Sequence, residues 1–160
     1  MQQSAIISLF RQYANDVNEL GTFIDLNGKE QRARLTELSS LTQNAPLPVI
    51  ALMQARSNFD PTKRTNNRHQ FIFLILDQST PGAASDITQS ALIDDATDEI
   101  ISRMEQLAHD FTGQIFSVQA IKQHKWQLDG TLELTAEKNI LSGYLTGVSM
   151  RFTLIDTNRC

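Results

Sequence analysis

A long amphipathic segment, Asp94 to Gly113, constrains the fold of this chain more than any other part of its sequence. Its apolar residues recur at the three- and four-residue spacing that places side chains on one face of an α-helix. They are Ala96, Ile100, Ile101, Met104, Leu107, Ala108 and Phe111. Asp94 or Asp95 is expected to cap this helix, and Gly113 is expected to end it. Because β patterns lie on both sides of the segment, we expect the helix to cover a sheet.

Two apolar runs before this helix predict strands. Residues 49–53, which follow Pro46 and Pro48, are continuously apolar, as in a strand that is buried on both faces. Residues 69–77 form a second, strongly apolar segment, and the Asn, Asp and Pro content of residues 56–68 between them is typical of a loop. We therefore expect a hairpin with a long exposed tip.

The sequence after Gly113 changes to a period of two residues, which is typical of strands with one buried face. Residues 126–134 and 145–155 alternate clearly, and residues 115–121 alternate less regularly. The buried face of the last segment is expected to consist of Val148, Met150, Phe152 and Leu154. These three segments predict three strands.

The N-terminal part of the chain predicts another helix and a less regular region. Apolar residues at helical spacing mark Ser4 to Asn18 as a helix, with Ser4 as its cap. Residues 23–26 predict a short strand, and the turn signal Asn27-Gly28 predicts that residues 29–35 return as its partner. Residues 36–41 are expected to form one short helical turn. Together, the pattern predicts a single α+β domain over 1–160: an antiparallel β-sheet on which the long amphipathic helix and the N-terminal helix pack.

The charged residues are unevenly distributed, although the net charge is only −4. Residues 1–70 hold eight Lys and Arg against six Asp and Glu, and residues 114–160 hold five against four. Residues 71–113 hold one basic residue, Arg103, against eight acidic ones. The long helix and the segment before it therefore carry the negative excess, and the chain has no general reason to bind nucleic acid.

The sequence contains no recognisable catalytic or metal-binding motif. It has no HExxH or CxxC pattern, no G-x-S-x-G and no glycine-rich phosphate loop. Glu105 and His109 have the spacing of a helical ligand pair, but His109 lies off the apolar stripe and is more simply a surface residue. Asp94, Asp95, Asp98 and Glu99 could bind a cation, although a charged first helical turn explains them more simply. We expect no enzyme activity, no cofactor and no metal.

Two further expectations concern the environment of the chain. The single cysteine, Cys160, cannot form an internal disulfide. No apolar run is long enough for a transmembrane helix, and the N-terminus lacks the pattern of a secretory signal. We therefore expect no membrane association.

The predicted hairpin tip is basic, and it complements the acidic helix. Lys63, Arg64 and Arg68 lie in or beside the tip, together with His69. The outer face of the long helix is expected to carry Asp98, Glu99 and Glu105. A basic tip on one subunit meeting an acidic helix face on the next would be a heterologous contact, which can close into a ring. These six charged residues are the predicted subunit interface.

The order of the elements resembles the small neck and tail-completion proteins of tailed bacteriophages, and the tail-terminator family in particular. The segment Leu145-Thr146-Gly147-Val148-Ser149-Met150-Arg151-Phe152-Thr153-Leu154, with Cys160 at the end, resembles the C-termini of phage and prophage proteins of Bacteroidetes. The resemblance in layout covers about residues 46–160. It implies a virion structural protein without catalytic residues, which forms a ring, often sixfold, at the head-proximal end of the tail tube. It also implies other tail or neck proteins as partners, and DNA only as cargo passing through a channel.

Two alternatives remain open at the level of sequence. The chain could be a small ligand-binding or enzymatic domain with a pocket between helix and sheet that includes His109 or Trp126. It could also be an adaptor of a bacterial injection or secretion apparatus, which is physically close to the ring hypothesis.

Overall fold

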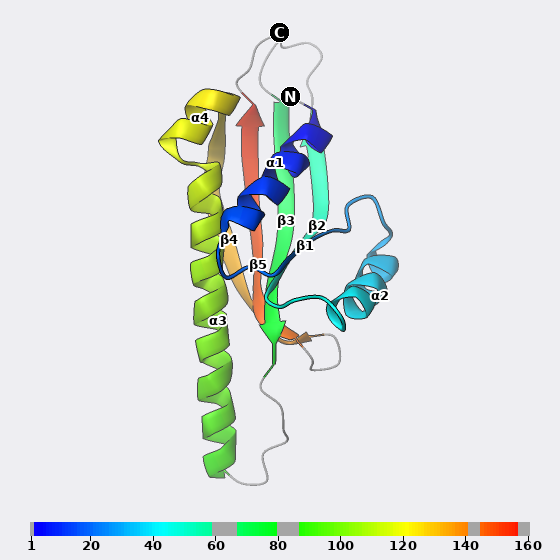
Figure 1. Ribbon diagram of the computed structural model, residues 1–160, viewed down its shortest axis with the longest axis vertical. Coiled ribbons are helices and arrows are strands. Elements are labelled where there is room, and N and C mark those ends of the chain that lie inside the picture. The colour runs from blue at the N-terminus through cyan, green and yellow to red at the C-terminus, as the bar shows by residue number, and fades with distance from the viewer. Residues whose placement is uncertain (1, 59–66, 80–86, 141–144, 157–160) are drawn as a thin grey trace.

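The structure, a computed structural model, describes residues 2–58, 67–79, 87–140 and 145–156. The helices are α1 (Gln3–Asp16), α2 (Gln31–Thr42), α3 (Ile87–Ile115) and α4 (Val118–His124). The strands are β1 (Thr22–Asp25), β2 (Val49–Asn58), β3 (Asn67–Gln78), β4 (Trp126–Asn139) and β5 (Leu145–Asp156). They form one sheet in the order β1-β2-β3-β5-β4, as Figure 1 shows. The predicted α+β class is confirmed.

The sheet is mixed rather than wholly antiparallel. Strands β2, β3, β5 and β4 pair antiparallel with their neighbours, whereas β1 pairs parallel to β2, with Thr22 opposite Val49. The predicted return strand at residues 29–35 is wrong, because most of that segment belongs to α2. A parallel pair needs a crossover of a dozen or more residues, and α2 provides it. The turn at Asn27-Gly28 does form, with Gly28 at φ 88°, but it leads into the helix.

One face of the sheet carries the main hydrophobic core, beneath α1 and α3. The Phe10 ring of α1 lies at its centre, 4.7 Å from the Phe71 ring and 5.9 Å from the Phe73 and Phe152 rings, measured between centroids. From α3, the buried contributors are Ile101, Met104, Leu107, Ala108, Phe111 and Ile115. The predicted helix face is therefore largely correct, and the predicted alternation of Val148, Met150, Phe152 and Leu154 in β5 is confirmed.

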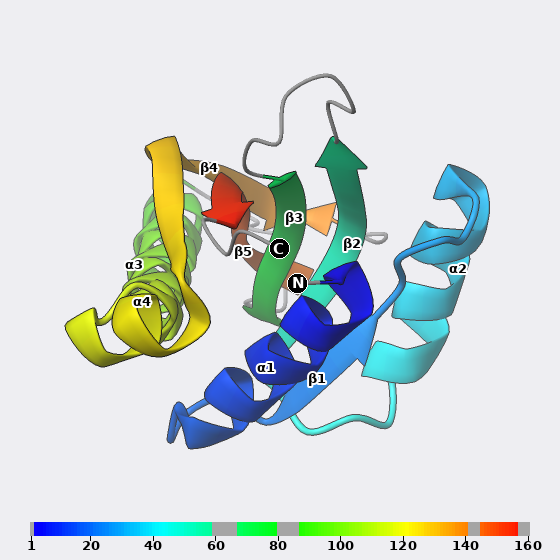
Figure 2. The same cartoon turned by 90° about the horizontal axis from the view of Figure 1, so that it is seen from above.

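The described residues cover the opposite face of the sheet only in part. Leu38 of α2 packs there against Leu74 and Leu76 of β3 and Leu145 of β5 in a smaller core. Farther along this face, Arg151 of β5 is exposed. Seen from above in Figure 2, α3 and α2 lie at opposite sides of the molecule, with the sheet between them.

The helix ends differ from the predictions. Helix α3 begins at Ile87 and continues to Ile115, so Asp94 and Asp95 lie inside it and Gly113 does not end it. Asp98 and Glu99 are consequently far from the first turn, where the helix dipole would favour a carboxylate. Helix α1 begins at Gln3, so Ser4 is not its cap.

The predicted strand at residues 115–121 is wrong, because α4 occupies most of that segment. The Ser117 side chain caps α4 by accepting a hydrogen bond from the Ala120 backbone N–H at 3.1 Å. A serine at this position satisfies one of the free donors of a first helical turn. Among the described residues, the strands β4 and β5 follow α3 in place of the three predicted, and the pairing of β4 with β5 is irregular between Asp129 and Glu133.

Candidate functional site

The predicted interface residues lie on two different parts of the molecule. Lys63 and Arg64 fall outside the described residues. Arg68 is exposed near the start of β3, and its Nε lies 3.4 Å from an Asp129 carboxylate oxygen of β4. The three predicted acidic residues are all exposed on α3 and form what we call the acidic α3 face: Asp98, Glu99 and Glu105.

The acidic α3 face is partly neutralised within the chain. The Lys138 ammonium of β4 lies 3.2 Å from the Asp98 carboxylate, whereas Arg103 of α3 lies 3.3 Å from Asp77 of β3, which is outside this face. Because the side chains of Lys138 and Asp98 are 55% and 64% exposed, this ion pair contributes about 0–1 kcal/mol to folding. The sequence prediction placed the compensating charge on the hairpin tip, and it missed the contribution of β4.

His69 does not belong to a basic tip, in contrast to the prediction. It is only 3% exposed, and it lies on the face of β3 opposite Arg68, because successive side chains of a strand alternate between faces. Its Nδ1 lies 2.7 Å from the Ser57 hydroxyl oxygen. Its Nε2 is buried and has no hydrogen-bond partner among the residues described.

Ser57, which contacts His69, also links α1 to the hairpin. The Gln3 amide donates to the Ser57 hydroxyl at 3.0 Å, and the Asn27 amide donates to Gln3 Oε1 at 3.3 Å. A Ser–His distance of this size also occurs in nucleophile–base pairs. Here the imidazole is covered, so a substrate has no room at the second ring nitrogen, and a structural role fits the geometry better. Nothing in the sequence pattern joins these residues, which come from different elements.

Stability should decrease as the pH falls, because two histidines are held in the neutral form. Burial lowers the pKa of His69 below its ordinary 6.5, although the Asp156 carboxylate opposes this shift, and burial also lowers the pKa of His124. Because the charged imidazolium is the form that burial disfavours, a histidine with a lowered folded pKa contributes its full stabilisation only where it is neutral in the unfolded chain as well. The stabilisation is therefore complete above about pH 6.5 and is lost as the pH falls toward the folded pKa values.

The measurement is the free energy of unfolding between pH 8 and pH 5, with the imidazole titrations followed by NMR. We expect the slope with pH to become smaller in His69→Gln, and the His69 resonance to titrate below the unfolded value. A His69 resonance that titrates above 6.5 would contradict this prediction.

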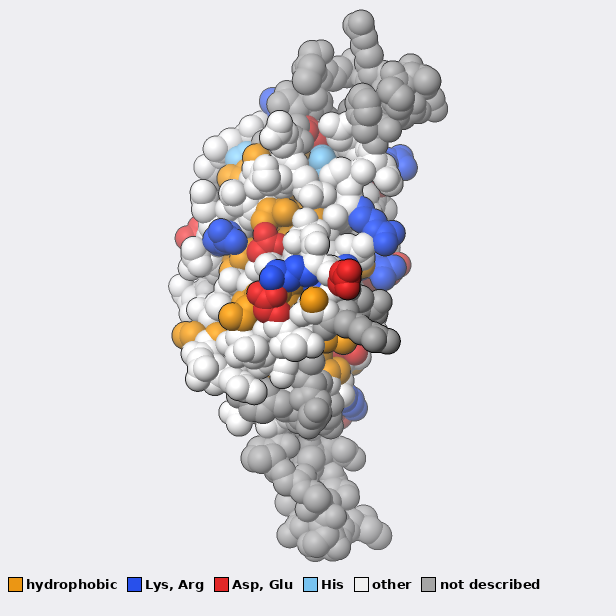
Figure 3. Space-filling model, turned by 90° about the vertical axis from the view of Figure 1, so that its right-hand side faces the viewer, with side chains coloured by type: hydrophobic (Ala, Val, Ile, Leu, Met, Phe, Trp, Pro, Cys, Tyr) orange, Lys and Arg blue, Asp and Glu red, His pale blue; other side chains and the backbone are white. Residues whose placement is uncertain are grey.

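A hollow lies between α2 and the uncovered part of the sheet, with a volume of about 320 Å³. We call it the arginine hollow, and its lining residues are Arg34, Leu35, Met53, Gln54, Arg56 and Ile72. Arg34 is held in place because its Nε donates to the Lys29 carbonyl at 2.7 Å and its Nη1 to the Met53 carbonyl at 2.9 Å. Figure 3 shows this side of the molecule, where Lys and Arg side chains gather near several acidic ones.

An apolar groove of about 480 Å³ lies on the other side of the molecule, between the C-terminal part of α3 and β4. We call it the α3–β4 groove. Its apolar walls are Phe116, Leu128, Leu132 and Leu134, all of them half-buried. His109 and Thr112 of α3 also line it. Strand β4 is the last strand of the sheet on this side, so its outer edge faces away from β5.

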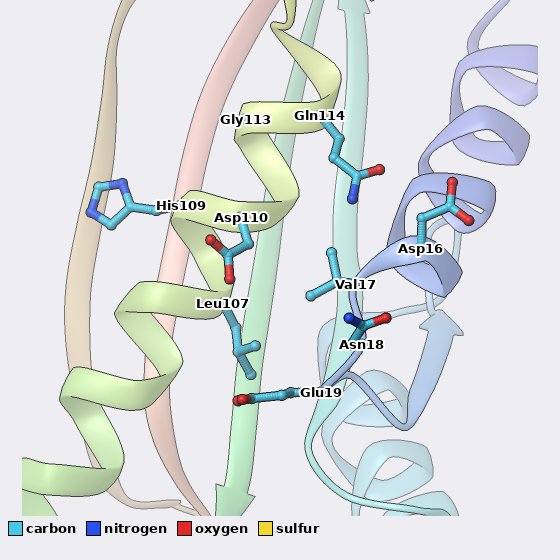
Figure 4. A pocket seen from close by; sticks show the side chains of 9 residues that line it. All are labelled: Asp16, Val17, Asn18, Glu19, Leu107, His109, Asp110, Gly113 and Gln114. Atoms are coloured by element: carbon cyan, nitrogen blue, oxygen red, sulfur yellow. The ribbon is translucent and has the colours of Figure 1, made fainter.

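A third hollow, of about 500 Å³, separates the end of α1 from α3. Figure 4 shows Asp110 and Gln114 of α3 on one side and Asp16 and Glu19 on the other, while the His109 ring points away from α1. Trp126, the other residue predicted for a ligand pocket, is buried, and its indole N–H donates to the Ile115 carbonyl at 2.8 Å. Of the two residues named for a ligand pocket, His109 lines this hollow and the α3–β4 groove, whereas Trp126 is buried in the core.

Two further properties follow from the described residues. In that part of the chain, no group of three or more His, Cys, Asp and Glu side chains is placed to hold a metal ion. Within the same residues, no helix is both long and apolar enough for a membrane crossing. No protein-family model matches the chain, and comparison with curated proteins gives no significant match.

Proposed function

We propose that this chain is a structural subunit of the neck or tail of a tailed bacteriophage. In this proposal it assembles head to tail into a ring that caps the tail tube or joins it to the head, and its location is the virion. The observation that carries the proposal is the element order on which the family resemblance rests. A helix comes first, then a proline-led strand in a hairpin, a long amphipathic helix and a terminal antiparallel pair, here α1, β2–β3, α3 and β4–β5.

The distribution of charge supports a head-to-tail contact rather than a symmetric one. Helix α3, which carries the acidic α3 face, and helix α2, which lines the arginine hollow, lie at opposite sides of the molecule (Figures 1 and 2). A group of carboxylates at one side and two arginines at the other are complementary to a second copy placed beside the first in the same orientation. Such heterologous contacts generate rings when the rotation between copies closes.

Reversal of the acidic α3 face tests the proposal. Replacing Asp98 and Glu99 by Lys should leave folding intact, because both side chains are exposed, and should abolish assembly through repulsion of basic groups on the neighbour. The thermal midpoint reports on folding. Light scattering at low salt and electron microscopy of the protein mixed with tail tubes report on assembly.

The reversal also disrupts the Asp98–Lys138 ion pair, so Lys138→Glu is the matched control. It breaks the same pair but adds negative charge to a face that is already acidic, and we expect it to assemble. Normal assembly of the Asp98→Lys, Glu99→Lys protein would show that this face is simply solvated.

The two alternatives lead to different observations. A ligand-binding or enzymatic domain would use a formed pocket, and the hollow between α1 and α3 is the place to search with a small-molecule thermal-shift screen. An adaptor of an injection or secretion apparatus would form the same kind of ring, and the genes that neighbour this one would separate it from a virion protein.

A further inference from the structure

The arginine hollow places the exposed side chain of Leu35 beside two cations. Leu35 of α2 is 43% exposed and Leu41 of the same helix is 42% exposed, whereas Leu38 is buried. The neighbouring Arg34 is fixed by two backbone carbonyls, and Arg56 comes from the adjoining strand β2. None of the described lining residues is acidic. Because an arginine has five N–H donors and the two bonds of Arg34 use only some of them, this site is prepared for a carboxylate.

The α3–β4 groove has the complementary character. Its three leucines and Phe116 are half-buried, so a hydrophobic side chain placed there would remove apolar surface from water. Glu105 lies one helical turn before His109, which lines the groove, and its side chain is exposed. The α3–β4 groove with Glu105 beside it is therefore complementary to Leu35 with its two neighbouring arginines.

We propose that Leu35 of one copy packs into the α3–β4 groove of the next, and that Arg34 and Arg56 face Glu105 of that neighbour. This inference rests on the proposed ring, and it names the contact that builds it. The occupant is a second copy because both charge and polarity are complementary, and because α2, which lines the hollow, and α3, which lines the groove, lie at opposite sides of the chain (Figure 2). Each copy then offers its hollow to one neighbour and its groove to the other.

Cysteine cross-linking tests this contact directly. In a Cys160→Ser background, Leu35→Cys and Leu132→Cys are combined in one chain and treated with a short bismaleimide. We expect a ladder of covalent multimers. An equal mixture of the two single-cysteine proteins should give dimers only, and Leu35→Cys alone should give none, because the contact is heterologous. Asp16→Cys, at an exposed position on α1, replaces Leu132→Cys in the control pair and should not cross-link.

Charge exchange adds a second readout. Arg56→Glu alone and Glu105→Arg alone should each lower the initial rate of cross-linking by about tenfold, as expected when opposite charges at a contact become like charges. The two changes combined in one chain should restore the rate to within about twofold of the parent. Asp16→Arg is the matched control for an acidic reversal elsewhere and should leave the rate unchanged. Circular dichroism of every variant establishes that it is folded.

The outcomes separate the contact from the function. Rings or tail-bound assemblies without cross-linking between positions 35 and 132 would overturn this contact and leave the proposed ring intact. Cross-linking of Leu35→Cys alone would show a symmetric dimer and would overturn both. Failure of the combined reversal to restore cross-linking would overturn the charge pairing. A folded protein that neither cross-links nor assembles with tail tubes would overturn both the contact and the proposed function.

Discussion

Replacing Phe10 by alanine is expected to destabilise the protein by about 3–5 kcal/mol. The Phe10 ring is fully buried, and it contacts rings from four other elements: Phe71 and Phe73 of β3, Phe111 of α3, Trp126 of β4 and Phe152 of β5. Edge-to-face contacts of this kind add about 0.5–1.5 kcal/mol beyond the burial of apolar area. The loss is a large fraction of the roughly 5–15 kcal/mol that stabilises a typical domain.

Thermal and urea unfolding measure this effect, and a decrease of roughly 10 °C in the thermal midpoint is expected. Leu35→Ala provides the control, because Leu35 is 43% exposed and should change stability by less than about 0.5 kcal/mol. A Phe10→Ala protein as stable as the Leu35→Ala protein would mean that α1 does not pack on the sheet as described.

The second large effect is expected at Gly147 of β5. A Cβ atom at this position would lie 1.9 Å from the Ile75 carbonyl oxygen of β3, and 3.0 Å from the Leu76 Cα atom. Both neighbours are backbone atoms of the adjoining strand, so they cannot move aside without separating β3 from β5. We expect Gly147→Ala to cost about 3 kcal/mol or more, because the strain of overpacking adds to lost ladder hydrogen bonds.

Gly113→Ala is the matched control for this substitution. Gly113 lies within α3, and a Cβ atom there would have no heavy atom within 4 Å. The change should stabilise the protein by about 0.5–1 kcal/mol, since alanine is the better helix former. Chemical denaturation of the two variants side by side tests the packing of β5 on β3. Equal stability of the two proteins would show that the close approach of these strands does not exist.

The strongly patterned elements were predictable from the sequence. The apolar stripe of α3 and the alternation of Val148 to Leu154 reflect burial against a core, and burial leaves a direct trace in residue type. Strands β2 and β3 were also predictable, because both faces of these strands are buried and their central residues are therefore apolar. Element ends were less predictable, as Asp94 shows, because several residues in a row are suitable caps.

The segments that were predicted wrongly are short and weakly patterned. Residues 29–35 contain Leu35 and few other apolar side chains, so neither helix nor strand leaves a clear periodicity there. The turn at Asn27-Gly28 was read correctly, but a turn does not specify whether the chain returns beside the strand or crosses over. In α4, seven residues are too few for a helical period to stand out from an irregular alternation.

The predicted site residues were placed less accurately than the strongly patterned elements, because a site brings together residues that are far apart in the sequence. Asp98, Glu99 and Glu105 were correctly expected on the outer face of α3, since helical spacing alone places them there. The arginine hollow was not predicted, because Arg34 and Arg56 come together only through the parallel pairing of β1 with β2. His69 was predicted both as the first residue of strand 69–77 and as a neighbour of the exposed basic tip, whereas its side chain is buried on the face of β3 opposite Arg68.

The class of the fold, the main core and the acidic outer face of α3 follow from the order of the residues alone. These properties depend on hydrophobic periodicity and local charge, which are written directly in the order of residues. The crossover of α2 to a parallel strand and the pairing of Lys138 with Asp98 became visible only in the folded chain. The same is true of the arginine hollow, lined by α2, β2 and β3, and of the apolar groove, lined by α3 and β4. Strand order and strand pairing bring residues together that are distant in the sequence, and such contacts cannot be predicted from a local pattern of residues.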